Sequence, residues 1–214
     1  EGAPEAFLAG VETGLKSPPS LLLRLFDDGG DALFGTSPHT GLLWALEVLA
    51  WSAEYLPRAA LALATLSRLD PGGRTLNRPL GSLHTIFLAW FPQTSASVEQ
   101  RFKVLDRVRS KEPEVAWRLL LDLLPARTMG TAFPNAEPHW REWTPEQDRQ
   151  VNAADYQQTV RGTAERVLQD VAADGARWSD VISNLDAIPP ECFDAVVARL
   201  SVMDPVSLAE SARE

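Results

Sequence analysis

Apolar residues recur along most of the chain at intervals of three and four positions, which is the spacing of an amphipathic α-helix. The pattern is clearest in a helix that starts after Ser95 or Ser97, where Val98, Phe102, Leu105 and Val108 fall on one helical face. No stretch of strand length alternates between apolar and polar residues. The chain therefore predicts an all-α fold.

Proline and glycine mark the ends of the predicted helices. Pro57 and Pro113 stand in the first turn of two runs, where the missing N–H costs nothing. The sequence Thr144-Pro145-Glu146-Gln147 matches a capping box and predicts a long helix to about Ala173, which Gly175 would end. The predicted helices cover about 4–16, 18–26, 40–53, 57–69, 79–90, 97–111, 113–123, 144–173, 177–187 and 191–203.

The spacing of these helices suggests how they are arranged. Helix pairs begin near residues 40, 77 and 113, a step of about 36 residues that is typical of stacked helical hairpins. We therefore expect an irregular α-solenoid of the divergent HEAT or armadillo type, with a non-repetitive helical bundle as the alternative. Six side chains on the periodic faces are expected to be buried at the helix interfaces: Trp44, Phe87, Phe102, Leu105, Leu119 and Leu120.

The helical pattern lapses once, over residues 125–143, and this gap is the best candidate for a boundary. We expect a helical-repeat region over 1–143, including an aromatic loop at 125–143, and an acidic helical region over 144–214 that continues it. Residues 1–144 carry 14 basic and 16 acidic residues, a net charge of -2. Residues 145–214 carry 6 and 13, a net charge of -7.

Charge and composition exclude several classes of protein. With 20 basic and 29 acidic residues the net charge is -9, so a chain-wide surface for nucleic acid is not expected. A single cysteine, Cys192, cannot form an internal disulfide, and its acidic neighbours predict an inert thiol. The most apolar stretch, 42–66, contains charged residues and a proline and is expected to be two helices rather than a membrane span. We expect a cytoplasmic protein without cofactor or metal, and, since the chain opens at Glu1, a segment of a longer one.

Little in the sequence points to catalysis. The three histidines, His39, His84 and His139, lie far apart, and no nucleotide-binding, hydrolase or zinc motif is present. The expectation is that the chain is not an enzyme.

Two features indicate a binding surface instead. Lys103, Arg107 and Lys111 project from one face of the helix at 97–111, within a wider basic cluster. They form either an ordinary solvated helix face or a patch that binds an anion or an acidic partner. Trp140 and Trp143 concentrate aromatic surface in the 125–143 loop and either seal that loop onto the helices or anchor a partner. The basic cluster also includes Arg74, Arg78, Arg101 and Arg109, and the loop also holds Phe133.

Residues 40–143 resemble large bacterial proteins of the nucleotide-binding sensor and anti-phage defence type. Such a segment would be a helical-repeat or connecting region beside an enzymatic domain elsewhere, and no functional residue is carried over. The resemblance rests on LLWALEVLAWSAEYLPRAALALATLSRLDPGG, NRPLGSLHTIFLAWFPQTSASVEQRFKVLDRV, EPEVAWRLLLDLLP and HWREW.

Two hypotheses about function follow. The first is a non-catalytic scaffold that binds protein, either in its own longer chain or in another subunit, with no membrane or nucleic-acid partner. The alternative is a small all-α enzyme that would use His84 or His139 with carboxylates such as Glu137 or Glu142. A site that gathers a histidine and two carboxylates would favour the enzyme.

Overall fold

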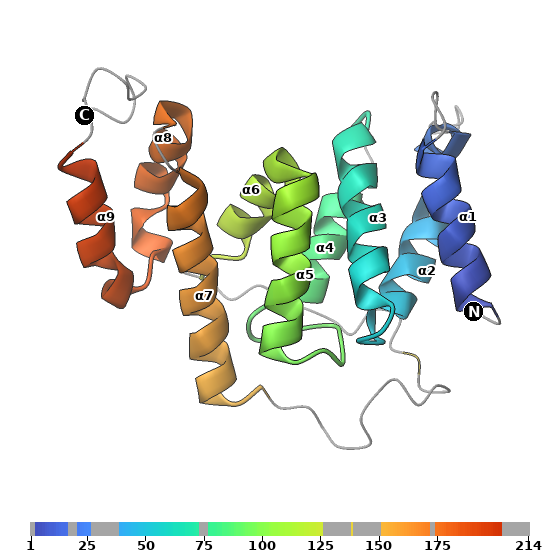
Figure 1. The fold of residues 1–214 in the computed structure, drawn as a ribbon, viewed down its shortest axis with the longest axis horizontal. Coiled ribbons are helices and arrows are strands. Elements are labelled where there is room, and N and C mark those ends of the chain that lie inside the picture. The colour runs from blue at the N-terminus through green and yellow to red at the C-terminus, as the bar shows by residue number, and fades with distance from the viewer. Residues whose placement is uncertain are drawn as a thin grey trace, which may run out of the picture. The chain divides into compact units, whose positions relative to one another are not determined.

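The computed structural model describes residues 3–16, 21–26, 39–72, 77–125, 138, 151–171 and 174–202. Every regular element in these ranges is a helix (Figure 1), so the predicted all-α class is confirmed. No helix among the described residues combines the length and the apolar character that a membrane crossing requires. The elements are α1 (Pro4–Lys16), η1 (Leu21–Phe26), α2 (His39–Ala50), α3 (Leu56–Leu69), α4 (Pro79–Phe87), α5 (Val98–Lys111), α6 (Pro113–Asp122), α7 (Ala153–Val171), α8 (Gly175–Ser183), η2 (Leu185–Ala187), η3 (Pro190–Cys192) and α9 (Phe193–Leu200).

The chain divides into two compact units. Unit 1 comprises Glu1–Ala116 and Ala132–Gln150, and unit 2 comprises Trp117–Thr131 and Val151–Glu214. The boundary thus falls inside α6. The predicted division at 143/144 lies outside the described residues.

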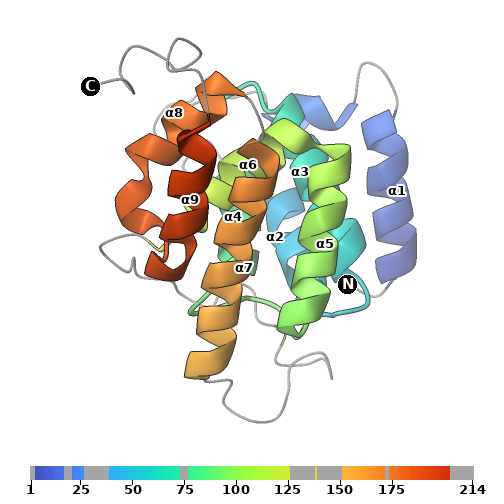
Figure 2. The same ribbon diagram turned by 60° about the vertical axis from the view of Figure 1, so that its left-hand side comes forward.

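Unit 1 is built from two layers of helices. In one layer α3 packs between α1 and α5, and in the other α2 packs on α4. Helix α3 also contacts α2 and α4, so it is the centre of the unit (Figure 2). Its alanines and leucines are buried along most of its length, which places the main core around this helix.

Ion pairs connect the charged edges of unit 1 to its core. On α3, Arg58 donates to the carboxylates of Glu5 and Glu12, one from each end of α1. Nearer the end of α3, Arg68 donates to Glu112 at 2.7 Å, and the Thr65 hydroxyl donates to the other Glu112 oxygen at 3.0 Å. These contacts fix α1 and the α5–α6 junction to the same central helix.

Local capping explains where α5 begins and ends. The Ser97 hydroxyl accepts from the Gln100 N–H, and the Gln100 side chain accepts from the Ser97 N–H, which together form a capping box. At the other end, the Glu112 N–H donates to the Val108 carbonyl, and Pro113 starts α6. Both bounds agree closely with the sequence prediction.

Unit 2 packs around Trp178 and the apolar face of α7. Trp178 is fully buried, together with Val167, Val171 and Val181. In the same unit, Trp117 Nε1 donates to Asp180 at 2.8 Å, and the Arg177 guanidinium lies 4.9 Å from the centre of the Trp117 ring. Helices α7 and α9 are joined through η3 and by an Arg199 bond to the Leu168 carbonyl.

Two of the six predicted core residues are not buried. Trp44 is 55% exposed on α2, and Phe102 is only half-buried on α5. Phe87, Leu105, Leu119 and Leu120 are buried as predicted. Helix α2 is apolar on all sides, so its hydrophobic pattern does not reveal which side faces outward.

Several predicted helix ends were wrong. The helices predicted to end at 53, 187 and 203 end at Ala50, Ser183 and Leu200. The helix predicted from 144 to 173 begins at Ala153, because Asn152 Oδ1 caps it by accepting from the Asp155 N–H at 2.8 Å. Gly175 begins α8 instead of ending α7, since Asp174 caps α8 through the N–H groups of the two residues after Gly175. The helix predicted over 79–90 ends at Phe87, and Leu88 already has an extended backbone.

The segment 18–26 was predicted to be one helix of a pair. A 3₁₀ helix, η1, occupies 21–26, and 17–20 lie outside the described residues.

Candidate functional site

Three exposed cations form a stripe along α5. Lys103, Arg107 and Lys111 are four residues apart, so their Cα atoms lie about 6 Å apart along the helix and span about 12 Å. We call these three residues the basic stripe. The opposite face of α5 carries Leu105 and Val108, which are buried in unit 1. The predicted helical phase is therefore right.

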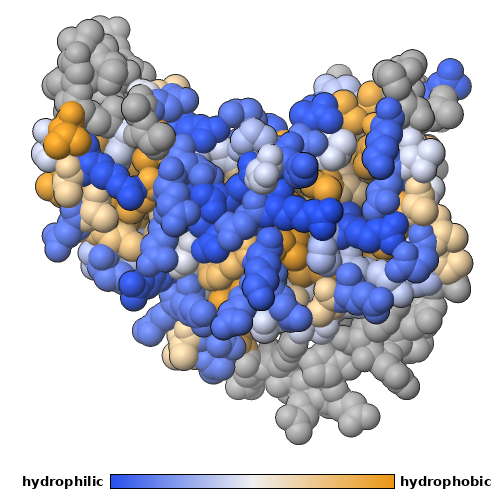
Figure 3. All heavy atoms as spheres, viewed as in Figure 1, coloured by the Kyte–Doolittle hydropathy of each residue, from blue (hydrophilic) through white to orange (hydrophobic). Residues whose placement is uncertain are grey.

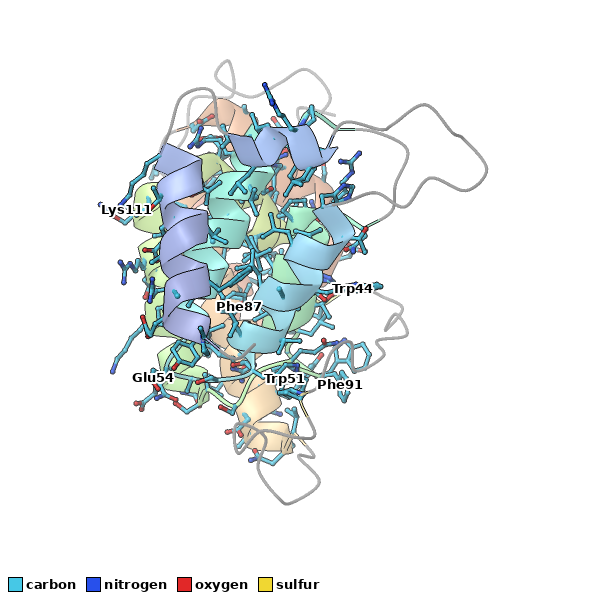
Figure 4. All side chains as sticks on the ribbon, turned by 90° about the vertical axis from the view of Figure 1, so that its right-hand side faces the viewer. Trp44, Trp51, Glu54, Phe87, Phe91 and Lys111 are labelled. Carbon is cyan, nitrogen blue, oxygen red and sulfur yellow. The ribbon has the colours of Figure 1, made fainter. Side chains whose placement is uncertain are left out.

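The basic stripe differs from most other cations of unit 1 in having no partner. Arg58, Arg68, Arg78 and Arg109 each bind a carboxylate at 3.0 Å or less. Within the part of the chain that the structure describes, no side chain of the stripe forms a hydrogen bond or an ion pair. Figure 4 shows Lys111 extending away from the helices.

The surroundings of the stripe are hydrophilic. Figure 3 shows polar side chains across the face of unit 1 on which α3 and α5 lie. Acids lie close to the stripe. Arg107 is among the cations that lower the pKa of Glu12, although the largest cause is the hydrogen bond from Arg58. Exposed Glu99 lies one helical turn before Lys103, so the charge of the stripe is partly offset at Arg107 and at Lys103.

The wider basic cluster separates on folding. Arg101 is buried on the inner side of α5, Arg109 pairs with Asp106, and Arg78 pairs with Asp70. Arg74 lies outside the described residues. Only the three cations of the stripe share one exposed face of α5.

The structure does not describe the aromatic residues of the 125–143 loop. Phe133, His139, Trp140 and Trp143 lie outside the described residues, as do Glu137 and Glu142. Their predicted roles in sealing the loop, in binding a partner or in catalysis remain predictions.

The two described histidines lie apart from any cluster of carboxylates. His39 is fully buried at the start of α2, where its ring stacks on Phe26 at 4.7 Å and its Nε2 donates to the Asn77 carbonyl at 3.0 Å. His84 is half-buried in α4. Among the described residues, no three histidines, cysteines or carboxylates gather as a metal site would require. These contacts make His39 a structural residue of the core.

The cysteine has the environment that its neighbours predicted. Cys192 is a free, buried thiol at the start of α9. Burial raises the pKa of Cys192, and the charges of Glu191 and Glu165 raise it further. A thiol whose proton is held in this way is a poor nucleophile.

A second group of polar side chains, on α2, just after it and on α4, was not predicted from the sequence. Glu47 is 6% exposed, accepts from the Ser82 hydroxyl at 2.6 Å through Oε1, and has no partner at Oε2. One turn later, Trp51 is 5% exposed and its Nε1 also has no partner. Burial raises the pKa of Glu47, and the bond from Ser82 opposes this only in part. The signal available in the sequence was a single acid inside the apolar run LLWALEVLAW.

Comparison of the chain with protein-family models, with curated proteins and with solved structures returned no significant match in any of the three. The conclusions below therefore rest on the residues of this chain.

Proposed function

We propose that this chain is a non-catalytic helical scaffold that binds an acidic protein segment through the basic stripe on α5. The observation that carries this proposal is that three exposed cations, none of them in an ion pair with a described residue, share one helical face of a chain whose net charge is -9. An unpaired row of like charges costs some free energy in the isolated protein, and a partner with carboxylates at matching spacing removes that cost.

The arrangement of unit 1 supports a scaffold. Helices α2, α4 and α6 begin at His39, Pro79 and Pro113, close to the starts from which the hairpin repeat was inferred. Alternate helices pack side by side, α1 with α3 and α3 with α5, as they do in stacked hairpins. We include in the proposal that the chain is a solenoid-like part of a longer cytoplasmic bacterial protein, possessing the connecting role that its resemblance to defence-type sensors implies.

A protein partner fits the stripe better than nucleic acid does. The stripe offers three cations, whereas duplex binding at cellular salt uses phosphate contacts over a much longer surface. No exposed aromatic side chain interrupts the stripe to stack on a base.

Binding of an acidic helical peptide tests the proposal directly. The probe carries glutamate at every fourth position, and its fluorescence anisotropy is measured against the whole chain from about 0.05 to 0.5 M NaCl. Reversing the stripe, in the variant K103E/R107E/K111E, should weaken binding about tenfold or more at the lowest salt, with a smaller effect at the highest.

A charge-matched control makes the result specific. The variant K16E/R24E/R118E reverses three exposed cations that lie on separate helices, so it changes the net charge by the same amount. The control should bind the peptide nearly as well as the wild type. If the two triple variants lose affinity equally, or if mixed-sequence duplex DNA of similar length binds more tightly than the peptide, the proposal is wrong.

A further inference from the structure

The second surface of interest begins with the exposed side chain of Trp44. The outward side of α2 carries Gly41, Trp44 and Ala45, and no exposed residue of this helix is charged. A tryptophan that is 55% exposed on an uncharged helix face is the kind of side chain that contacts a ligand or partner.

More aromatic rings lie beside the C-terminal half of α2. The segment that follows α4 packs there, because the Ser95 N–H donates to the Trp51 carbonyl at 2.8 Å and the Ser95 hydroxyl accepts from the Ala53 N–H at 3.2 Å. This segment contains Trp90 and Phe91, both half-buried, whose ring centres are 6.0 Å apart. In Figure 4, Trp44, Trp51 and Phe91 lie on the side of unit 1 that faces away from α1.

The same face of α2 holds two unsatisfied polar atoms. Trp44, Glu47 and Trp51 are three and four residues apart, so they form one row along the helix. Glu47 Oε2 is an acceptor without a donor, and Trp51 Nε1 is a donor without an acceptor. Buried groups left in this state cost free energy, and a cation beside Glu47 Oε2 would recover the part that belongs to this carboxylate.

We propose that Trp44, Trp90 and Phe91, with the carboxylate of Glu47, form a binding site for an alkylammonium cation, presented by a small molecule or by a lysine side chain of another protein. Aromatic faces attract such cations, and a buried carboxylate supplies the opposite charge. The site differs from the basic stripe in position, in charge and in the chemistry it recognises.

A cation explains these residues better than an apolar ligand does. An apolar ligand would cover Trp44 and leave Glu47 Oε2 buried without a partner. Burial raises the pKa of Glu47, with the bond from Ser82 opposing it, and no cation pairs with this carboxylate among the described residues. Because Glu47 Oε2 is buried, entry of a ligand requires a change of rotamer among the side chains that cover it.

Isothermal titration of the whole chain with three probes tests the proposal. The first two are choline and a capped Gly-Lys-Gly peptide, which distinguish a free ammonium compound from a lysine side chain. The third is 3,3-dimethyl-1-butanol, which has the shape of choline without its charge. We expect at least one cation to bind about tenfold or more tightly than the neutral alcohol. The proposal is overturned if neither choline nor the lysine peptide binds more tightly than the alcohol.

Variants then assign the residues. Glu47→Gln should weaken binding of the cation about tenfold, and Trp44→Ala should weaken it several-fold. Glu54→Gln removes an equal charge from an exposed position seven residues away and should change nothing. The affinity of the wild type should rise with pH as Glu47 ionises, and that of Glu47→Gln should not. If Trp44→Ala unfolds, Trp44→Phe tests the same contact and should retain most of the binding. Unchanged affinity in Glu47→Gln excludes the site.

Discussion

Helices α2 and α5 have similar lengths and belong to the same unit, yet they expose opposite kinds of surface. On α5 the exposed positions are charged or polar and the buried ones apolar, apart from Arg101. On α2 the exposed residues are Gly41 and Trp44, and the one carboxylate is buried. Charge therefore faces outward on α5 and inward on α2.

The buried acids of this part of the molecule differ in the same way. Glu112, at the end of α5, receives hydrogen bonds from Arg68 and Thr65, so both its oxygens and its charge have partners. Glu47 has one bond from Ser82 and no cation. Removing the partner of a buried charge is strongly destabilising, whereas neutralising a buried charge that has no counter-ion relieves its desolvation cost, so the two acids should respond differently to substitution. The four predictions below test this contrast.

The largest effect should come from the buried face of α5. Leu105→Ala removes a side chain that is 2% exposed and should lower the free energy of unfolding by about 2–5 kcal/mol. Phe102→Ala should cost less than the full aromatic deletion because Phe102 is only half-buried. Trp44→Ala on α2 should cost less than about 1 kcal/mol. Urea unfolding followed by circular dichroism measures all three, and a larger loss for Trp44→Ala than for Leu105→Ala would reverse the assignment of faces.

The second largest loss of stability should come from Glu112, the buried acid that pairs with Arg68. Glu112→Gln keeps the shape of the side chain but removes its charge, and should lower the free energy of unfolding by about 1–3 kcal/mol. Arg68→Ala removes the cation, whose side chain is half exposed, and should cost less. A stabilising Glu112→Gln would show that the pair at the end of α5 is no better satisfied than Glu47.

Neutralising Glu47, the buried acid that has no cation beside it among the described residues, should raise the free energy of unfolding instead of lowering it. Burial raises the pKa of Glu47 above its value in the unfolded chain, so the folded state holds the proton more tightly. The contribution to stability is complete below the unfolded pKa and is lost as pH rises through the folded pKa. Glu47→Gln should therefore stabilise the protein at neutral pH and lose this advantage in acid. Thermal melts across that range check the sign, and a constant difference between variant and wild type would contradict it.

The smallest effect should come from the outer face of α5. Reversing Lys103, Arg107 and Lys111 to glutamate should change the free energy of unfolding by about 0.5 kcal/mol or less, because no contact within the described residues is lost. Arg107→Glu alone should account for most of any change, since it places a second acid near Glu12. Denaturant titration of single and triple variants measures this, and unfolding of the triple variant would show that the stripe is packed.

The comparison also explains what the sequence could predict. The phase, start and end of α5 followed from its apolar row, its Ser97 cap and Pro113, all of which are local signals. The exposure of Trp44 could not be predicted, because α2 is apolar on every side and its orientation depends on packing against α3 and α4. The basic stripe was identified because charge is visible in a sequence.

The second site was not predicted because it is marked by buried polar atoms that lack a hydrogen-bond partner. The sequence shows that Glu47 is an acid, but only the structure shows that its Oε2 atom has no donor and that Trp51 Nε1 has no acceptor. The start of α7 was misplaced because Thr144 and Asn152 are both residues that cap helices well, and the sequence alone does not choose between them. In the structure, Asn152 caps α7.

Helix α1 should open locally while the rest of unit 1 stays folded, because its polar contacts with α3 depend on the ion pairs of Arg58 with Glu5 and Glu12. Two buried residues, Leu8 and Val11, and one guanidinium connect this helix to α3. Local opening of such a helix exposes its amides without unfolding α3, so α1 should exchange its amide hydrogens with solvent sooner than the helix it covers. The pKa of Glu12 is held low by Arg58, and this anchor is therefore lost only as pH falls through that depressed value. Acid should thus release α1 first and leave the centre of unit 1 still protected.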